Sequence, residues 1–336
     1  LSYRLRGNPP HKNGLIGKIR YLGYQIRMII QSFYPLMLNT AKRSRTTVEA
    51  LELRGYRYSI QNPEVKKMKL SMYIDFHTHG KLAKKLPFSK EYTDWLFREA
   101  QKSGLDALCL TEHFNTLGFQ EVYRYISGRC TREGDSLVTE SGFRIFPGME
   151  TDIAEGGHTL IIGPMECILE MNRRLEPNKE KGKFLTFEEL AQMVEQYPVI
   201  FGAGHPFRDG GHIPELPQEM LEKFFFLDVN GKDLARDCDG TWEKMRALSR
   251  KLDRPLVAGS DTHQSFQYGC VWNEFRQTVH TVQDLAAEIT NGAYEIRMSD
   301  SLAFKVESAG ILKRALKEID ALGGDYVSVL LKGAEI

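Results

Sequence analysis

The stretch YIDFHTH, residues 73–79, ends an apolar run and carries two histidines two positions apart. Side chains at positions i and i+2 of a β-strand point to the same face, roughly 7 Å apart along the backbone. Asp75, His77 and His79 are therefore expected on one face of a strand. Two imidazoles this close at a strand end can share one metal ion, although two histidines can also meet there by chance.

Residues of the same chemical types recur at the ends of other apolar runs. The further stretches are TEH at 111–113, GME at 148–150, GGH at 156–158, GAGHP at 202–206 and GSDTH at 259–263. Together with the first stretch they hold six of the nine histidines, which independent structural histidines would not do. The candidate metal ligands are His77, His79, His113, Glu150, His158, His205, Asp261 and His263.

From Met72 onward, short apolar runs alternate with amphipathic ones, a pattern typical of parallel strands joined by helices. The expected strands are 72–77, 107–111, 143–147, 158–163, 199–203, 225–229 and 256–259. The expected helices include 91–103, 186–196, 217–223, 241–252 and 282–291. About seven such units favour a closed or nearly closed α/β barrel, which keeps its active site at the carboxyl ends of its strands.

The donor set indicates a catalytic metal site. Neutral imidazole and carboxylate without thiolate suit Zn, Mn or Fe. Six imidazoles and two carboxylates exceed the needs of one ion, so at least two ions are expected, with one carboxylate bridging them. Two ions a few ångströms apart can hold a hydroxide and polarise a phosphoryl oxygen, which predicts hydrolysis of phosphate esters.

These motifs resemble the polymerase-and-histidinol-phosphatase (PHP) family of metal-dependent phosphoesterases over about residues 72–304. The resemblance implies a distorted seven-stranded α/β barrel with two or three divalent ions at the strand ends. It also implies a role for each candidate ligand. One ion would bind His77, His79 and Asp261; Glu150 would bridge it to a second ion on His158 and His205; and His113 and His263 would reach a third.

The sequence departs from the family pattern at one point. Many members carry another His or Asp five or six residues after the second histidine of the first motif, as a ligand of the third ion. Here those positions are Lys84 and Lys85, and an ammonium group does not ligate a metal unless it is deprotonated. The third ion is then weak or absent, or a lysine charge replaces it, or both lysines are solvated loop residues.

Further polar residues near these motifs are candidates for other roles. Arg208 is a catalytic and substrate-binding candidate, because guanidinium pairs bidentately with phosphate, and Lys81 is a second substrate-binding candidate. Asp261 is also a catalytic candidate, as a proton shuttle. Glu112 either orients an imidazole or is exposed, and Asn230 either contacts substrate or forms a turn.

Residues 1–70 form a separate segment, rich in Lys and Arg and predicted to be helical. The motifs Leu5-Arg6-Gly7 and Leu53-Arg54-Gly55 resemble the coupling helices of the T component of energy-coupling-factor transporters, over residues 1–68. The resemblance implies transporter ATPases as partners and membrane spans upstream of Leu1. We therefore expect two domains, a coupling-helix-like segment at 1–70 and the hydrolase barrel at 71–336.

The composition limits the alternatives. Five cysteines without CxxC spacing indicate a reduced, cytoplasmic protein, located at the membrane face if upstream spans exist. The favoured partner is a small phosphorylated substrate. A 3′-5′ exonuclease of the same family is the alternative, but the barrel segment is net acidic and lacks an aromatic and basic groove pattern. The other alternative is a transporter coupling module that carries the barrel as a passenger.

Overall fold

The computed structural model describes residues 71–332. The chain divides into two units between Lys67 and Met68, and the second unit is described by itself. The basic helical segment and its coupling motifs lie outside the described residues. Within 71–332, no helix is long and apolar enough to cross a membrane.

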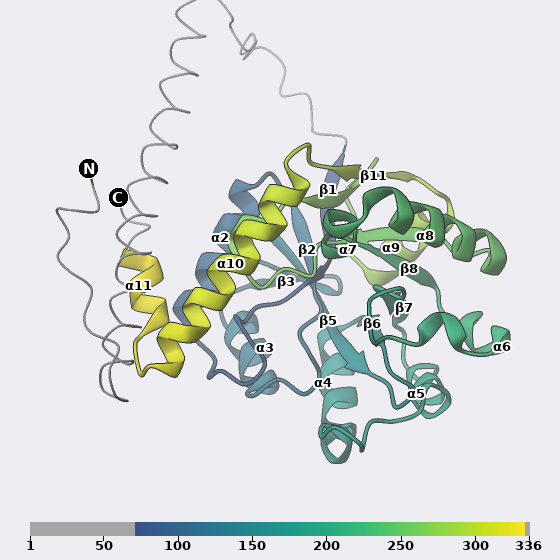
Figure 1. Ribbon diagram of the computed structural model, residues 1–336, viewed down its shortest axis with the longest axis horizontal. Coiled ribbons are helices and arrows are strands. Elements are labelled where there is room, and N and C mark those ends of the chain that lie inside the picture. The colour runs from purple at the N-terminus through teal and green to yellow at the C-terminus, as the bar shows by residue number, and fades with distance from the viewer. Residues whose placement is uncertain (1–70, 333–336) are drawn as a thin grey trace, which may run out of the picture. The chain divides into compact units, whose positions relative to one another are not determined.

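Seven strands form a nearly closed barrel, which confirms the predicted fold (Figure 1). Neighbouring strands are joined in the order β1-β2-β5-β6-β7-β8-β9. Their bounds are β1 Met72–Thr78, β2 Ala107–Leu110, β5 Arg144–Asp152, β6 His158–Ile162, β7 Ile200–Gly204, β8 Phe226–Asn230 and β9 Leu256–Gly259.

The barrel closes between β1 and the segment that follows β9. Thr78 and Thr262 form a parallel bridge, and the backbone N–H of Asp261 donates to the carbonyl of His77 at 2.7 Å. Nearer the start of β1, one side chain bridges the gap between β1 and β9. The Asn273 amide bonds both backbone groups of Ala258 on β9, each at 2.8 Å, and the carbonyl of Ile74 on β1 at 3.0 Å.

One strand runs against the expected parallel order. β6 is antiparallel to both β5 and β7, because a short turn containing Gly156 and Gly157 joins it to β5 as a hairpin. This reversal corrects the all-parallel interpretation. It also explains why His158 lies at the start of its strand, since the start of β6 pairs with the ends of β5 and β7 at Asp152 and Gly204.

Four further strands were not predicted. β10 (Val271–Phe275) pairs antiparallel with β1, and β11 (Tyr294–Met298) extends the sheet beyond it. β3 (Thr131–Glu133) and β4 (Ser136–Val138) form a small hairpin that pairs with β5.

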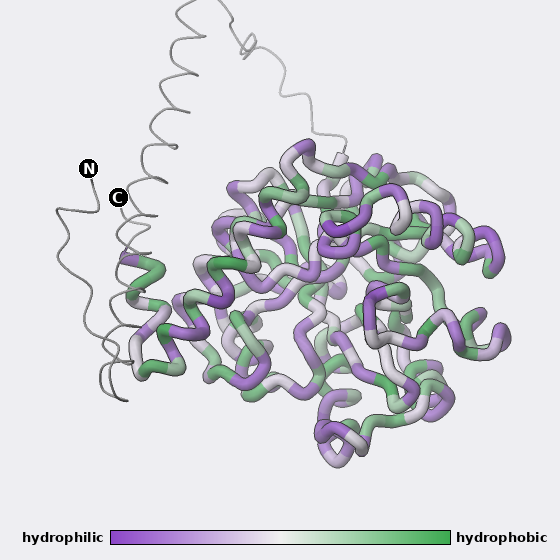
Figure 2. Tube along the Cα trace, in the orientation of Figure 1, coloured by the Kyte–Doolittle hydropathy of each residue, from purple (hydrophilic) through white to green (hydrophobic). Residues whose placement is uncertain are grey.

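The helices lie around the sheet (Figure 1). Their bounds are α2 Lys90–Lys102, α3 Phe119–Ser127, α4 Met165–Arg174, α5 Phe187–Val194, α6 Gln218–Leu221, α7 Gly231–Arg236, α8 Cys238–Leu252, α9 Val282–Thr290, α10 Leu302–Ala321 and α11 Tyr326–Lys332. Two spans for which no helix was expected, 118–142 and 166–185, contain α3 and most of α4. In Figure 2 hydrophobic and hydrophilic residues alternate along α10.

Two apolar clusters hold the barrel together. The outer one packs α2, α3, α4, α5 and α8 against the sheet. The inner one takes alternate residues of the seven barrel strands, such as Phe146, Leu160 and Phe226, and the buried face of α9. This apolar plug fills one part of the interior and leaves the carboxyl ends of the parallel strands for polar side chains.

Candidate metal centre

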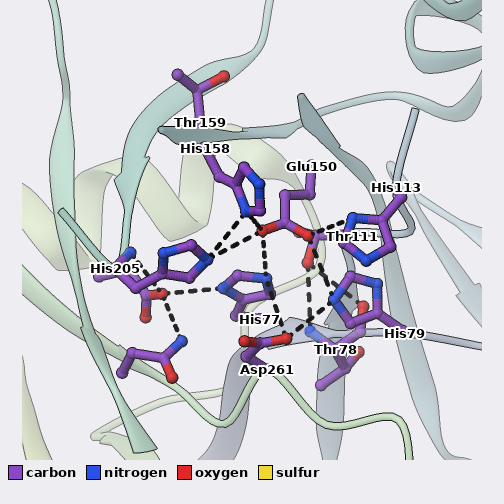
Figure 3. Close-up of polar contacts among 12 residues, drawn as sticks. His77, Thr78, His79, Thr111, His113, Glu150, His158, Thr159, His205 and Asp261 are labelled. Carbon is purple, nitrogen blue, oxygen red and sulfur yellow. Dashed lines mark hydrogen bonds and ion pairs between the residues drawn. The ribbon is translucent and has the colours of Figure 1, made fainter. Parts of the chain in front are cut away.

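Eight buried or half-buried ligand-type side chains converge at these strand ends. Figure 3 labels all of them except His263. His77 and His79 come from the end of β1 and the residue after it, and Glu150 comes from β5. Between Asp75 and Thr78 the pairing of β1 with β2 shifts register. Ile74 and Phe76 belong to the inner apolar cluster, so this irregularity brings His77 to the same interior as its neighbour Phe76.

The alternation of side chains along a strand predicts that Asp75 lies with the imidazoles of His77 and His79, but it does not. Its Oδ1 accepts the backbone N–H groups of Ser260 at 2.9 Å and His77 at 3.2 Å. Burial raises the pKa of Asp75 to about 7, against the hydrogen bonds from Ser260 and His77 and the His77 charge, which lower it. Asp75 therefore ties β1 to the segment after β9.

Glu150 stands at the centre of the cluster, and its two oxygens face different imidazoles. Oε1 lies 2.6 Å from His158 Nδ1 and 3.1 Å from His205 Nε2. Oε2 lies 2.7 Å from His113 Nδ1 and 3.5 Å from His79 Nε2. A carboxylate that turns one oxygen to each of two imidazole sets is arranged to bridge two ions.

The charge state of Glu150 follows from these neighbours. Burial alone would raise the pKa of Glu150, but the charges of His158, His113 and His77 outweigh burial and hold that pKa well below its usual range. The centre therefore contains an ionised, buried carboxylate, which needs positive charge around it.

Three groups of side chains place their ligand atoms within 4.8 Å of one another. The groups are His77 with His79 and Asp261, then His77 with Glu150 and His205, and then His79 with His113 and His263. The first coincides with the set that the family resemblance implies for one ion. The second contains two of the three residues implied for another ion, and the third contains both histidines implied for the last.

Buried nitrogen atoms without a hydrogen bond support the fit of metal ions. Among the described residues, Nε2 of His77 and both ring nitrogens of His79 are buried and have no such partner. An unpartnered buried polar atom is costly, and an ion would satisfy it. Nδ1 of His77 is 2.9 Å from Asp228 Oδ2, and Nδ1 of His263 is 3.0 Å from the Lys81 carbonyl. A proton on each Nδ1 leaves each Nε2 lone pair for a metal.

His158 has two carboxylate neighbours. Besides Glu150, its Nε2 lies 3.0 Å from Oδ1 of Asp152. Burial alone would lower the pKa of His158, but the Glu150 charge and the Asp152 hydrogen bond raise it to about 10. Lys84 is one of the two lysines at the positions where the sequence departs from the family pattern. Its ammonium group lies 3.8 Å from the Asp152 carboxylate and is partly exposed. Its ammonium charge is thus placed beside the His158 end of the site.

Glu112 orients the loop after β1. It accepts the backbone N–H of Gly80 at 3.0 Å, and its Oε1 lies 3.7 Å from Nδ1 of His79. Glu112 is fully buried, so the exposed alternative is excluded. Burial alone would raise the pKa of Glu112, but the nearby imidazole of His79 lowers it.

Arg208 is tied to residues of the site. Its guanidinium donates to Asp233 at 3.0 and 3.3 Å, to Asn230 at 2.6 Å and to Oδ2 of Asp261 at 2.5 Å. Lys232 also lies 2.9 Å from that oxygen. Asn230 accepts from Arg208 and caps α7, where its side chain accepts from the Lys232 backbone N–H.

Asp261 is held as a carboxylate. Burial alone would raise the pKa of Asp261, but the charges of Lys232 and Arg208 hold it well below its usual range. Its Oδ1 faces the imidazoles, 3.3 Å from His79 Nε2.

Lys81 lies away from the other candidates. Its ammonium group is buried and donates to the Leu117 carbonyl at 2.5 Å. The structure therefore does not bring this ammonium to the imidazoles. The backbone carbonyl of Lys81 is the group that faces His263.

Asp228, Asp152 and Lys232 were missed by sequence reasoning. Asp228 contacts His77 and also accepts the backbone N–H of His205 at 3.3 Å. Its signal is a single carboxylate inside the apolar run FFFLDV, residues 224–229, where a buried charge requires a partner. Asp152 and Lys232 gave no comparable signal.

Comparison with known proteins agrees with this geometry. Residues 242–294 match the PHP_C family model, described as PHP-associated. No curated protein matches the chain. PsfC from Pseudomonas syringae PB-5123 has a similar structure, with a TM-score of 0.61, 23% identity, and coverage of 73% of this chain and 99% of that one.

Endonuclease Q is also similar. PfuEndoQ from Pyrococcus furiosus has a TM-score of 0.53 at 19% identity, covering 67% of this chain and 57% of that one. Endonuclease Q in complex with a 27-mer duplex has a TM-score of 0.52 at 16% identity, covering 68% and 58%. The chain thus spans little more than half of endonuclease Q. The fold and the family match confirm the resemblance to PHP proteins. The match covers none of residues 1–68, so the transporter interpretation stays a prediction without support.

Proposed function

We propose that this chain is a metal-dependent hydrolase that cleaves phosphate esters. The observation that carries the proposal is the convergence of six imidazoles and two carboxylates around Glu150, with buried ring nitrogens left for ions. Divalent ions such as Zn, Mn or Fe, when bound there, polarise a phosphoryl oxygen and supply a nucleophile at neutral pH.

Charged side chains of the site would surround such a substrate. Glu150 would hold an ion together with His77 and His205, and its second oxygen faces His113 and His79. Arg208 positions Asp261 through its fixed bonds to Asp233. The four bonds that its guanidinium donates to Asp233, Asn230 and Asp261 leave one of its five N–H groups for a phosphate oxygen. Because the pKa of Asp261 is held low, Asp261 stays ionised at neutral pH and has no proton to donate to a leaving group.

The test uses the purified full chain. We expect two or more Zn, Mn or Fe ions per chain by elemental analysis, and release of p-nitrophenol from p-nitrophenyl phosphate. His77→Ala and Asp261→Ala should each abolish turnover and retain the circular dichroism of the wild type. His212→Ala is the matched control, since His212 is exposed and pairs with Glu215. Full activity in both site variants, or a metal-reconstituted protein without turnover on any ester, contradicts the proposal.

Cleavage of nucleic acid is the second candidate, because the fold is shared with endonuclease Q, whose solved complex contains duplex DNA with an abasic lesion at the active site. The site chemistry serves a phosphodiester as well as a monoester. Bis(p-nitrophenyl) phosphate and end-labelled single-stranded and duplex oligonucleotides separate the two. Products that shorten from the 3′ end support the exonuclease alternative, and an internal cut supports an endonuclease.

A further inference from the structure

Two cationic side chains flank the outer oxygen of Asp261. Arg208 and Lys232 both contact Oδ2, whereas Oδ1 faces the imidazoles. The positive charge of Arg208 is matched by Asp233, which it contacts twice. Among residues 71–332, Lys232 forms an ion pair only with Asp261, a residue that would share its charge with a bound ion. Once an ion binds Asp261, the ammonium of Lys232 has no carboxylate of its own.

A third cation comes from the C-terminal helix α10. This helix packs on α7, which carries Lys232, and on the turn Ser265–Gln267 that follows His263. Lys313 of α10 is half-buried, and its charge acts on His263, Asp261 and Lys232. Within residues 71–332 its ammonium makes no hydrogen bond or ion pair.

Lys232 and Lys313 therefore form a pair of like charges at the edge of the site. Burial and the Lys232 charge together lower the pKa of Lys313 to about 7, against the opposing effect of Asp261. The two like charges repel each other and are only partly offset by Asp261, and this repulsion is relieved when an anion binds between them.

We propose that Lys232 and Lys313 form an anion subsite beside Asp261, which takes a second negatively charged group of the substrate. The proposal rests on the proposed function for the position of the scissile phosphate at the ions. It adds that the preferred esters carry a further carboxylate or phosphate on the organic part. Neither lysine is a candidate metal ligand, and α10 lies outside the matched family model.

The test compares the binding of two phosphonates, neither of which has an ester bond to hydrolyse. Propylphosphonate and 3-phosphonopropanoate differ only in a terminal methyl group and a terminal carboxylate. Their affinities for the manganese-loaded full chain are measured by calorimetry. We expect the wild type to prefer the carboxylate compound by about 10-fold, in line with a charged hydrogen bond.

Substitutions then test which residues cause the preference for the carboxylate compound. Lys313→Gln should reduce it to less than about threefold, and Lys313→Arg should retain most of it, because charge is what matters. Lys317→Gln is the matched control, since Lys317 is exposed one turn further along the same helix. Lys232→Gln should also lose the preference.

The outcomes separate the two proposals. A preference lost in Lys313→Gln and kept in Lys317→Gln supports the subsite, even if no ester is hydrolysed and the proposed function fails. Equal binding of the two phosphonates by the wild type overturns the subsite even in an active enzyme. A full preference retained by both Lys313→Gln and Lys232→Gln overturns it as well. Repeating the titrations with a diphosphonate of similar length distinguishes a phosphate-binding subsite from a carboxylate-binding one.

Discussion

Nδ1 of His77 lies 2.9 Å from Oδ2 of Asp228, and both side chains are fully buried. The bond joins the first and the sixth strand of the barrel. It fixes the imidazole so that Nε2 faces Glu150, 3.4 Å away. Outer carboxylates of this kind set the tautomer and the basicity of a metal-binding imidazole.

Asp228→Asn should therefore weaken metal binding while the barrel stays folded. An amide can place its N–H toward Nδ1 and favour the wrong tautomer, so we expect a loss of about 10- to 100-fold in affinity. Titration of zinc against a competing chelator measures this loss. Asp209→Asn is the control, because Asp209 is exposed and pairs with Arg236. Unchanged zinc affinity in Asp228→Asn contradicts the assigned role of Asp228.

Metal binding should release protons. Burial alone would lower the pKa of His77, but the Glu150 charge and the Asp228 bond raise it to about 10, and the pKa of His158 is likewise about 10. Below about pH 10 the metal-free site therefore holds imidazolium protons that an ion must displace. Metal affinity should rise as the pH rises toward 10. Calorimetry in buffers of different ionisation enthalpy counts the protons released, and a count of zero at pH 7.5 contradicts the expectation.

The same shifts predict the stability of the metal-free protein. A histidine whose pKa is raised in the folded state stabilises that state fully below its unfolded pKa, about 6.5. This stabilisation is lost as the pH rises through about 10. The metal-free protein should therefore lose stability between about pH 7 and pH 10, and the zinc-loaded protein should not, as thermal melts at each pH will show.

The seven barrel strands could be predicted from sequence because each is a short apolar run that ends in small or ligand-type residues. The reversal of β6 could not, because a hairpin and a helical crossover are not distinguished by the strand residues themselves. β10 and β11 escaped notice for another reason. Residues of β10 alternate between buried and half-buried positions, whereas those of β11 are half-buried or exposed. Charged residues such as Glu274 and Arg297 interrupt the apolar pattern.

The residues of the candidate site also fall into those that could be predicted from the sequence and those that could not. Residues that end strands, such as Glu150 and His205, are visible in sequence because barrels keep their ligands there. Partners that act through a second residue are not, since only the folded chain shows that Asp228 meets His77. Lys313 is still harder to find from sequence. Its helix begins about 40 residues after the last candidate ligand, His263, and the helix carries no motif that would predict a contact with the site.

Asp75→Asn should stabilise the metal-free protein above neutral pH. The pKa of Asp75 is raised to about 7 from an ordinary value of 3.8, so the folded state loses stability as the pH rises from about 4 to about 7, and the loss persists above that. Asparagine keeps the Oδ1 acceptor for Ser260 and His77. The shift corresponds to at most roughly 4 kcal/mol, and burying an amide N–H₂ offsets about 1–3 kcal/mol of it.

The measurement for Asp75→Asn is the difference in unfolding free energy between variant and wild type at pH 5 and at pH 8. We expect a gain of up to roughly 3 kcal/mol at pH 8 relative to pH 5, because the cost of burying the amide is the same at both pH values. Asp253→Asn serves as a control, because Asp253 lies at the C-terminal end of α8 rather than in the barrel interior. An equal effect of Asp75→Asn at both pH values shows that its carboxyl group is already ionised at pH 5.

Gly259→Ala should disrupt the metal centre through the backbone. A methyl group at this position would overlap Cβ of His77 and lie 2.6 Å from Oδ1 of Asp228 and 3.0 Å from the backbone nitrogen of His77. The end of β9 packs directly on the end of β1, so neither strand can move without displacing a candidate ligand. We expect a loss of about 2 kcal/mol or more in the unfolding free energy. Zinc affinity should fall with it.

Gly310→Ala is the matched control for that substitution. Gly310 lies within α10, and an added methyl group there meets no atom within 4 Å. Alanine in a helix should then be neutral or stabilising by about 0.5–1 kcal/mol. Chemical denaturation and zinc titration of both variants separate the effects. A Gly259→Ala protein with wild-type stability and zinc affinity would mean that β1 and β9 can part without loss, and that the metal ligands do not depend on the close contact between these two strands.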